Sequence, residues 1–236
     1  MKIRLKVNGI IIALAVLLIA VFPAVFLRPP KTGPWDEAAE AVGITFILLG
    51  QLLRTCARGY KSEHSQEGRS LIQGGPYNLV RNPMYLGILL IGVGMVLVLF
   101  QWWAAVIFLV VFTARYILLI FQEEKKLLAL FPQEYSVYCL RVPRLLPPLK
   151  ILVKRDISVY LPLRPAWLKK EIGTTLAVLL ITLLLEFWQD IKVQGIKVYF
   201  KESIAILVIV ALFVGLYIYL SRRTANISKN NVSSQS

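Results

Sequence analysis

The sequence predicts an all-α, polytopic integral membrane protein with about six transmembrane helices. The chain is 57% hydrophobic and has a mean hydropathy of +0.67, which is more apolar than a soluble domain. Its apolar residues gather in stretches close to the roughly twenty residues that cross a bilayer core. Most of its 27 Lys and Arg residues lie between these stretches. Together these observations exclude the class of soluble globular proteins.

Six apolar stretches are candidates for transmembrane helices. In chain order they cover about residues 7–27, 38–54, 83–100, 102–121, 171–188 and 203–220. The second is the weakest candidate, because Glu40 and Gln51 dilute its hydropathy. The first follows basic residues as a signal peptide would, but its long apolar run without a clear cleavage site favours an uncleaved anchor.

The distribution of basic residues predicts the orientation of the chain in the membrane. One side of the bilayer carries 21 Lys and Arg residues, in the termini and the two large loops, and the other side carries five. By the positive-inside rule, both termini and both large loops lie in the cytosol. The membrane would be the plasma or inner membrane of a bacterium, or the endoplasmic reticulum of a eukaryote.

Neither the net charge of +14 nor the two cysteines requires a further partner or a metal. Anionic lipid headgroups are a sufficient partner for the basic excess, so we expect no nucleic acid and find no sign of an obligate protein partner. Cys56 and Cys139 are far apart in the sequence and form no metal-binding set with the single His64. We therefore expect neither a disulfide nor a metal site.

We divide the chain at about residue 148. Residues 1–148 hold four spans and the cytosolic helices, and they form the membrane core. Residues 149–236 begin with a basic segment in which Tyr160 and Trp167 are typical of a membrane surface. A transmembrane hairpin and a disordered tail follow.

Residues 74–87 connect a polar loop to the third span and predict the start of a helix that runs to about Phe100. Asn82 suits the N-cap, and Pro83 suits the first turn because its missing N–H donor would be unpaired there. The first amides of this helix and the neighbouring Arg81 together favour a carboxylate or a phosphate. A capped helix with a snorkelling arginine explains the same residues without a ligand.

Two glycines of the third span, Gly87 and Gly94, share one face of the helix because they are seven residues apart. Small residues allow membrane helices to approach closely, which predicts a packing role. The missing side chains would equally leave room for the adenosine of a ligand or for a lipid tail.

The fourth span ends in two adjacent carboxylates, Glu123 and Glu124. At a helix C-terminus they would face the negative end of the helix dipole and each other. Lys125 and Lys126 can neutralise them, and a bound cation can do the same. In an antiparallel hairpin this cation site and the anion site at Arg81 lie at one membrane face. That polarity suits a zwitterion with extra positive charge, such as S-adenosylmethionine.

A second short helix is predicted after Pro132, beyond an amphipathic continuation of the fourth span. On it Glu134, Tyr138 and Arg141 are spaced i, i+4 and i+7, so they would share one face. An interfacial amphipathic helix with an exposed polar face would have the same pattern.

Five short motifs follow one another between residues 75 and 143. They are Gly75-Pro76-Tyr77, Val80-Arg81-Asn82-Pro83-Met84-Tyr85-Leu86-Gly87, Glu123-Glu124, Phe131 with Glu134-Tyr135 and Tyr138, and Arg141-Val142-Pro143. Over about residues 45–148 the chain resembles the isoprenylcysteine carboxyl methyltransferases. The related phosphatidylethanolamine N-methyltransferases share the arginine–proline and paired-glutamate motifs. The chain departs from the pattern at Asn82, where the family often has histidine, and at Pro132, where it usually has glycine.

This resemblance implies an integral membrane enzyme that transfers a methyl group from S-adenosylmethionine to a lipophilic acceptor at the cytosolic face. The acceptor would be an isoprenylcysteine-type carboxylate or a lipid amine. The resemblance also implies catalytic roles near the acceptor for Glu134 and Arg141, and Tyr77 or Tyr85 would face the sulfonium. The implied cofactor pocket consists of Arg81, Asn82, Pro83, Tyr85, Glu123 and Glu124.

Two other functions fit parts of the pattern. A membrane reductase of the steroid type shares a similar C-terminal helical arrangement and binds NADPH instead, which is an analogy at the level of fold. A non-enzymatic membrane scaffold would keep the motifs only for packing. Binding of S-adenosylmethionine, of NADPH or of neither distinguishes the three functions.

Overall fold

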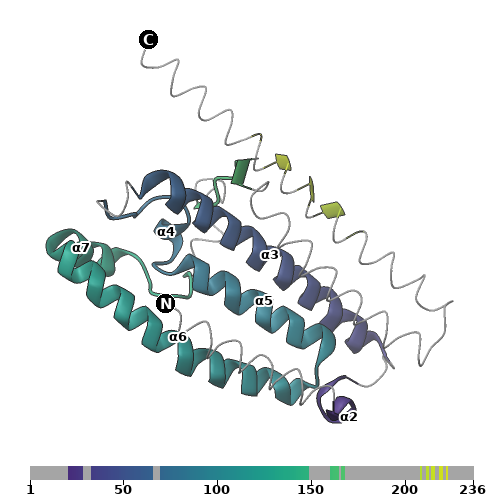
Figure 1. Cartoon of the computed structure of the whole chain (residues 1–236). Coiled ribbons are helices and arrows are strands. Elements are labelled where there is room, and N and C mark those ends of the chain that lie inside the picture. The colour runs from purple at the N-terminus through teal and green to yellow at the C-terminus, as the bar shows by residue number, and fades with distance from the viewer. Residues whose placement is uncertain are drawn as a thin grey trace.

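The computed structural model describes residues 21–28, 33–65, 70–148, 160–164, 166–167 and isolated positions between 208 and 222. This part of the chain is helical and has no strand, in agreement with the predicted all-α class. Figure 1 shows α3, α5 and α6 side by side, with α4 and α7 at one end and α2 at the other. The helices are α2 (Pro23–Phe26), α3 (Pro34–His64), α4 (Pro76–Leu79), α5 (Pro83–Leu99), α6 (Trp102–Leu130) and α7 (Pro132–Arg141).

The predicted third span is confirmed as α5, which begins at Pro83 and ends one residue before Phe100. The second and fourth spans are also helices, but α3 continues to His64 and α6 to Leu130. Both are long and apolar enough to cross a membrane, and α5 is a shorter apolar helix. The first and sixth spans lie mostly, and the fifth entirely, outside the described residues, so the number of six remains a prediction.

Close packing of α3 against α5 forms the core of the described bundle. A Cβ atom added to Gly50 would lie 2.6 Å from the carbonyl oxygen of Gly87, and one added to Gly87 would lie 2.7 Å from that of Gly50. The packing role predicted for Gly87 is therefore confirmed, because backbone of α3 occupies the space. Buried aliphatic side chains continue the contact along the two helices: Ile44, Ile47, Leu48, Val98 and Leu99.

The third helix of the bundle, α6, presents most of its apolar surface outward. Of its side chains only Phe112, Ile120 and Glu124 are buried among the described residues. The exposed large apolar side chains of α6 include Val106, Ile107, Val110, Val111, Ile117 and Leu118. Such a surface is unfavourable in water and suits the hydrocarbon core of a membrane.

The segment that contains Tyr160 and Trp167 differs from the prediction of a membrane-surface segment. Both side chains are buried, at 5% and 4% exposure, because the segment packs against the end of α3 near α4. The Trp167 ring occupies the space beside Gly59, where no Cβ atom would fit, and its indole N–H donates to a carboxylate oxygen of Glu63. Arg164 forms an ion pair with the same carboxylate at 2.8 Å. Buried aromatic packing with a satisfied indole is thus preferred here over the interface.

Candidate active site

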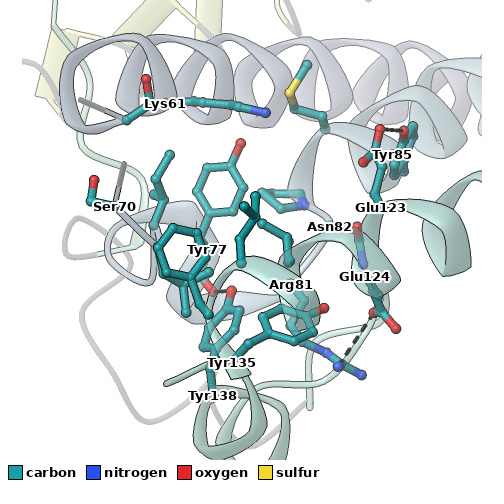
Figure 2. Close-up of a pocket in the computed structure, with 18 of the residues that line it drawn as sticks. Lys61, Ser70, Tyr77, Arg81, Asn82, Tyr85, Glu123, Glu124, Tyr135 and Tyr138 are labelled. Carbon is teal, nitrogen blue, oxygen red and sulfur yellow. Dashed lines mark hydrogen bonds and ion pairs between the residues drawn. The ribbon is translucent and has the colours of Figure 1, made fainter. Parts of the chain in front are cut away.

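A cavity of about 350 Å³ lies where the end of α3, the start of α5, the later part of α6 and α7 meet. Its volume is within the range of small-molecule sites. Figure 2 shows the side chains that surround it. All seven residues predicted to contact a cofactor line this cavity: Tyr77, Arg81, Asn82, Pro83, Tyr85, Glu123 and Glu124.

A glycine turn brings the first of these residues to the cavity. Gly75 has a φ of +56°, a left-handed conformation that side chains other than glycine rarely adopt. The ring of Tyr60 also lies 2.8 Å from where a Cβ atom of Gly75 would stand. The chain then makes the single helical turn α4, which places Tyr77 on the lining, and continues to Arg81.

The side chain of Asn82 does not cap α5, which corrects the sequence prediction. The residue occupies the N-cap position, but no side-chain capping bond is formed. Its Nδ2 instead donates to the carbonyl oxygen of Arg144 at 3.0 Å, and the amide of Arg81 donates to the carbonyl oxygen of Pro143 at 2.8 Å. These two bonds tie the segment after α7 to the start of α5.

Glu124 is held by two arginines, and the prediction that it stands at a helix C-terminus is wrong. Because α6 continues to Leu130, the helix dipole is not the main local field at this carboxylate. Arg144 donates from Nε to both carboxylate oxygens at 3.1 and 3.2 Å and from Nη2 to Oε2 at 2.9 Å. These bonds raise the pKa of the Arg144 guanidinium. Nη1 of Arg81 lies 3.5 Å from Oε1.

Arg81 combines this ion pair with an unused donor. Its side chain is 11% exposed, and Nη1 also donates to the sulfur of Cys139. Its Nε is buried and has no hydrogen-bond partner among the described residues. A buried N–H without an acceptor is costly, so this guanidinium suits an additional anionic oxygen.

Glu123 has a different environment from its neighbour. It is exposed, accepts a hydrogen bond of 2.8 Å from the hydroxyl of Tyr85, and has no cationic partner in the described part of the chain. The ring of Tyr85 packs edge-on against Tyr116 with centroids 5.2 Å apart. In Figure 2, Tyr85 and Glu123 stand together at one side of the cavity. This carboxylate is therefore available to a cationic group of a ligand.

Tyrosines of α4 and α7 form the remaining polar wall. The Tyr138 hydroxyl donates to the carbonyl oxygen of Tyr77, and the Tyr77 hydroxyl donates to that of Ala57 at 3.4 Å. Burial is the main cause that raises the pKa of Tyr77, Tyr135 and Tyr138, so all three stay protonated at neutral pH. These three side chains thus form a neutral part of the cavity wall.

The two residues predicted for catalysis, Glu134 and Arg141, are exposed on α7 and are not among the residues that line this cavity. The three residues predicted to share one face of α7 differ in burial. Tyr138 is buried at 4% exposure, whereas Glu134 and Arg141 are exposed. The buried face of α7 consists of Tyr135 and Tyr138. The catalytic role of Glu134 and Arg141 stays a prediction.

Sequence reasoning missed one wall of the cavity. Lys61 and Ser65 reach it because α3 continues ten residues beyond the predicted end of its span. The uninterrupted polar helix pattern after residue 54 was the available signal. Three further missed lining residues come from the loop that follows: Ser70, Leu71 and Ile72.

Comparison with known proteins agrees with the motifs. A family model described as phospholipid methyltransferase matches residues 39–134. This region is therefore similar to that methyltransferase family. The matched region contains every predicted site residue except Arg141. The family match and the two apolar helices α3 and α6 together support a membrane protein.

A curated relative supports the same family. The chain is 33% identical over 113 residues to protein-S-isoprenylcysteine O-methyltransferase B of Arabidopsis thaliana. The match covers 44% of this chain and 57% of that relative, so the chain spans less than two thirds of it. No solved structure matches the chain. The resemblance to isoprenylcysteine and phospholipid methyltransferases is thereby confirmed.

Proposed function

We propose that the protein transfers a methyl group from S-adenosylmethionine to a lipophilic acceptor at the cytosolic face of a membrane. The acceptor is an isoprenylcysteine-type carboxylate or a lipid amine. The observation that carries this proposal is the meeting of all seven expected donor-site residues around one cavity inside the family-matched region. Neither the NADPH reductase nor the scaffold has a comparable observation in its favour.

The groups around the cavity fit the charges of the donor. Arg81, with its unpaired Nε, would hold the carboxylate of the donor, and Glu123 would hold its ammonium group. The ring of Tyr85 or Tyr77 would face the sulfonium, an attraction of roughly 0.5–2 kcal/mol. When bound, S-adenosylmethionine supplies a methyl group that passes in line from its sulfur to an oxygen or nitrogen of the acceptor, leaving a neutral thioether. The protein mainly positions the partners for that displacement.

Different roles for the two glutamates follow from their different partners. Because Arg144 already neutralises Glu124, we assign the ligand's ammonium group to Glu123. Glu124 acts as a positioning residue, which holds the guanidinium of Arg81 at the cavity wall through the contact of 3.5 Å.

A titration of S-adenosylmethionine into the purified protein in detergent tests the donor site. Arg81→Ala is expected to weaken binding by about 2–5 kcal/mol, because a desolvated carboxylate loses its charged partner. Arg81→Lys is expected to recover part of the affinity, since a point charge cannot replace a two-pronged guanidinium. Unchanged affinity in the alanine variant would contradict the assignment of Arg81. Competition with NADPH would indicate the reductase, and binding of neither compound would indicate the scaffold.

Glu134 and Arg141 are proposed to act on the acceptor from the exposed side of α7. Arg141 would orient a carboxylate acceptor, which needs no base, and Glu134 would accept the proton that an amine acceptor loses. Glu134→Gln and Arg141→Ala are therefore expected to lower turnover and leave the affinity for S-adenosylmethionine nearly intact. Calorimetric titration beside a turnover assay measures both quantities. Loss of donor binding in Glu134→Gln would place that carboxylate in the donor site instead.

A further inference from the structure

We propose that Lys61 binds the anionic group of the acceptor, a carboxylate or a phosphate that lies close to the methylated atom. This inference rests on the proposed function and names a specificity residue for it. Lys61 stands in the last turn of α3 and lines the same cavity as Arg81 and Glu123. In Figure 2 its side chain runs from α3 along the edge of the cavity, apart from Glu124 and Tyr135.

The charges on the cavity wall show why Lys61 needs an anion. The charged residues of the described lining are two cations, Lys61 and Arg81, and two anions, Glu123 and Glu124. Arg144, which is not part of the lining, neutralises Glu124 through three hydrogen bonds. A bound ligand therefore meets two positive groups and one available negative group.

The donor uses only part of this set. Its carboxylate would pair with Arg81 and its ammonium group with Glu123. Its sulfonium would then bring a further positive charge into a cavity where the described residues offer Lys61 no anionic partner. No described residue forms an ion pair with Lys61. An anionic acceptor lowers this positive excess by one charge, whereas a neutral acceptor leaves the ammonium of Lys61 and the sulfonium facing one cavity.

The wall around Lys61 suits a lipophilic acid. Ser65 and Ser70 add hydroxyl groups to the lining, and the apolar side chains Leu71 and Ile72 line the same cavity. In Figure 2 the Lys61 side chain extends toward the middle of the view, between Ser70 at one side and Tyr85 and Glu123 at the other. A molecule with an apolar tail and an anionic head would meet apolar lining and the ammonium of Lys61 together.

A purely structural role is the competing explanation. A lysine in the last turn of a helix is favourable beside the negative end of the helix dipole, without any ligand. That role predicts a change in stability when the charge is removed, but no dependence on the charge of an acceptor. The experiment therefore compares compounds that carry a carboxylate or a phosphate with analogues that lack this group.

The binding test uses two pairs of probes with the full chain in detergent. The first pair is N-acetyl-S-farnesylcysteine and its carboxamide, and the second is a short-chain phosphatidylethanolamine and the diacylglycerol of equal chain length. Lys61→Gln is expected to weaken binding of the member that carries the carboxylate or the phosphate in one pair by about fivefold, since the site is partly open to solvent. Binding of the neutral member is expected to stay unchanged. Lys61→Arg should keep the preference, and Lys126→Gln, which changes an exposed lysine of α6 outside the lining, is the matched control.

The outcomes separate the sources of the anion. If Lys61→Gln weakens binding only in the farnesylcysteine pair, the group that Lys61 binds is a carboxylate. If it weakens binding only in the phospholipid pair, that group is a lipid phosphate. Equal effects of Lys61→Gln on both members of each pair, or a wild-type protein without preference for either acid, would overturn the proposal. It would also be overturned if Lys61→Gln weakened S-adenosylmethionine as strongly as Arg81→Ala does. A wild-type protein that binds no S-adenosylmethionine, by contrast, would refute the proposed function itself.

Discussion

At the scale of single residues, the paired glutamates show how neighbours in sequence acquire different roles. Successive residues of an α-helix point about 100° apart, so Glu123 and Glu124 meet different neighbours although both line the cavity. Glu124 turns toward Arg144 and is 9% exposed, whereas Glu123 meets the hydroxyl of Tyr85 and is exposed. The sequence motif alone treats them as equivalent.

Replacing each glutamate separately is expected to separate two effects: a loss of stability in one variant and a loss of ligand binding in the other. Glu124→Gln removes the partner of Arg144 and should lower the free energy of unfolding by about 1–3 kcal/mol, less than for a fully buried pair because the Arg144 side chain is 43% exposed. Glu123→Gln should leave the melting temperature nearly unchanged and weaken S-adenosylmethionine binding. Thermal unfolding and calorimetric titration of both variants measure the two effects. Equal stability losses in both variants would refute separate roles.

At the scale of elements, the α3–α5 contact positions the cavity that we propose as the donor site. The helices meet through glycines, so the start of α5 with Arg81 lies against the extended end of α3 with Lys61. The polar segment after α7 then closes the site through its backbone bonds to Arg81 and Asn82. A change in the spacing of the two helices would therefore move opposite walls of the cavity apart.

Gly50→Ala is expected to destabilise the bundle by about 1–3 kcal/mol, because the added methyl group would overlap the backbone of Gly87. Gly33→Ala is a suitable control, since nothing lies within 4 Å of the point where its Cβ atom would stand and the residue precedes α3. Thermal unfolding in detergent compares the two variants. Similar melting temperatures for both variants would contradict this prediction, because they would show that α3 and α5 can move apart without loss of stability.

At the scale of the whole molecule, the site and the orientation depend on each other. The cavity is lined by residues of α4 and α7, which Figure 1 shows at one end of the bundle. If the donor is supplied from the cytosol, this end must face the cytosol. The segment around Trp167 and Arg164 packs at the same end through Glu63, so residues after 148 contribute to its stability.

Topology reporters test this orientation. A reporter fused after Ser236, or inserted between residues 63 and 68, is expected to give a cytosolic signal because 21 of the Lys and Arg residues lie on that side. Reporters near Lys31 and Lys192 should give an external signal. Protease protection of sealed vesicles provides an independent measurement. An external signal from the insertion between residues 63 and 68 would place the cavity on the side without the donor.

The sequence by itself determined the helical membrane class, the start of α5 and seven residues that line the cavity. These follow from local properties, since hydropathy, the proline at the first helical turn and short motifs depend on neighbouring residues. The tertiary structure decided the partners of the charged groups. Arg144 and Glu124 are 20 residues apart, and the burial of Tyr160 and Trp167 depends on Gly59 and Glu63 of a distant helix. Such pairings depend on how the helices pack, which no local pattern specifies.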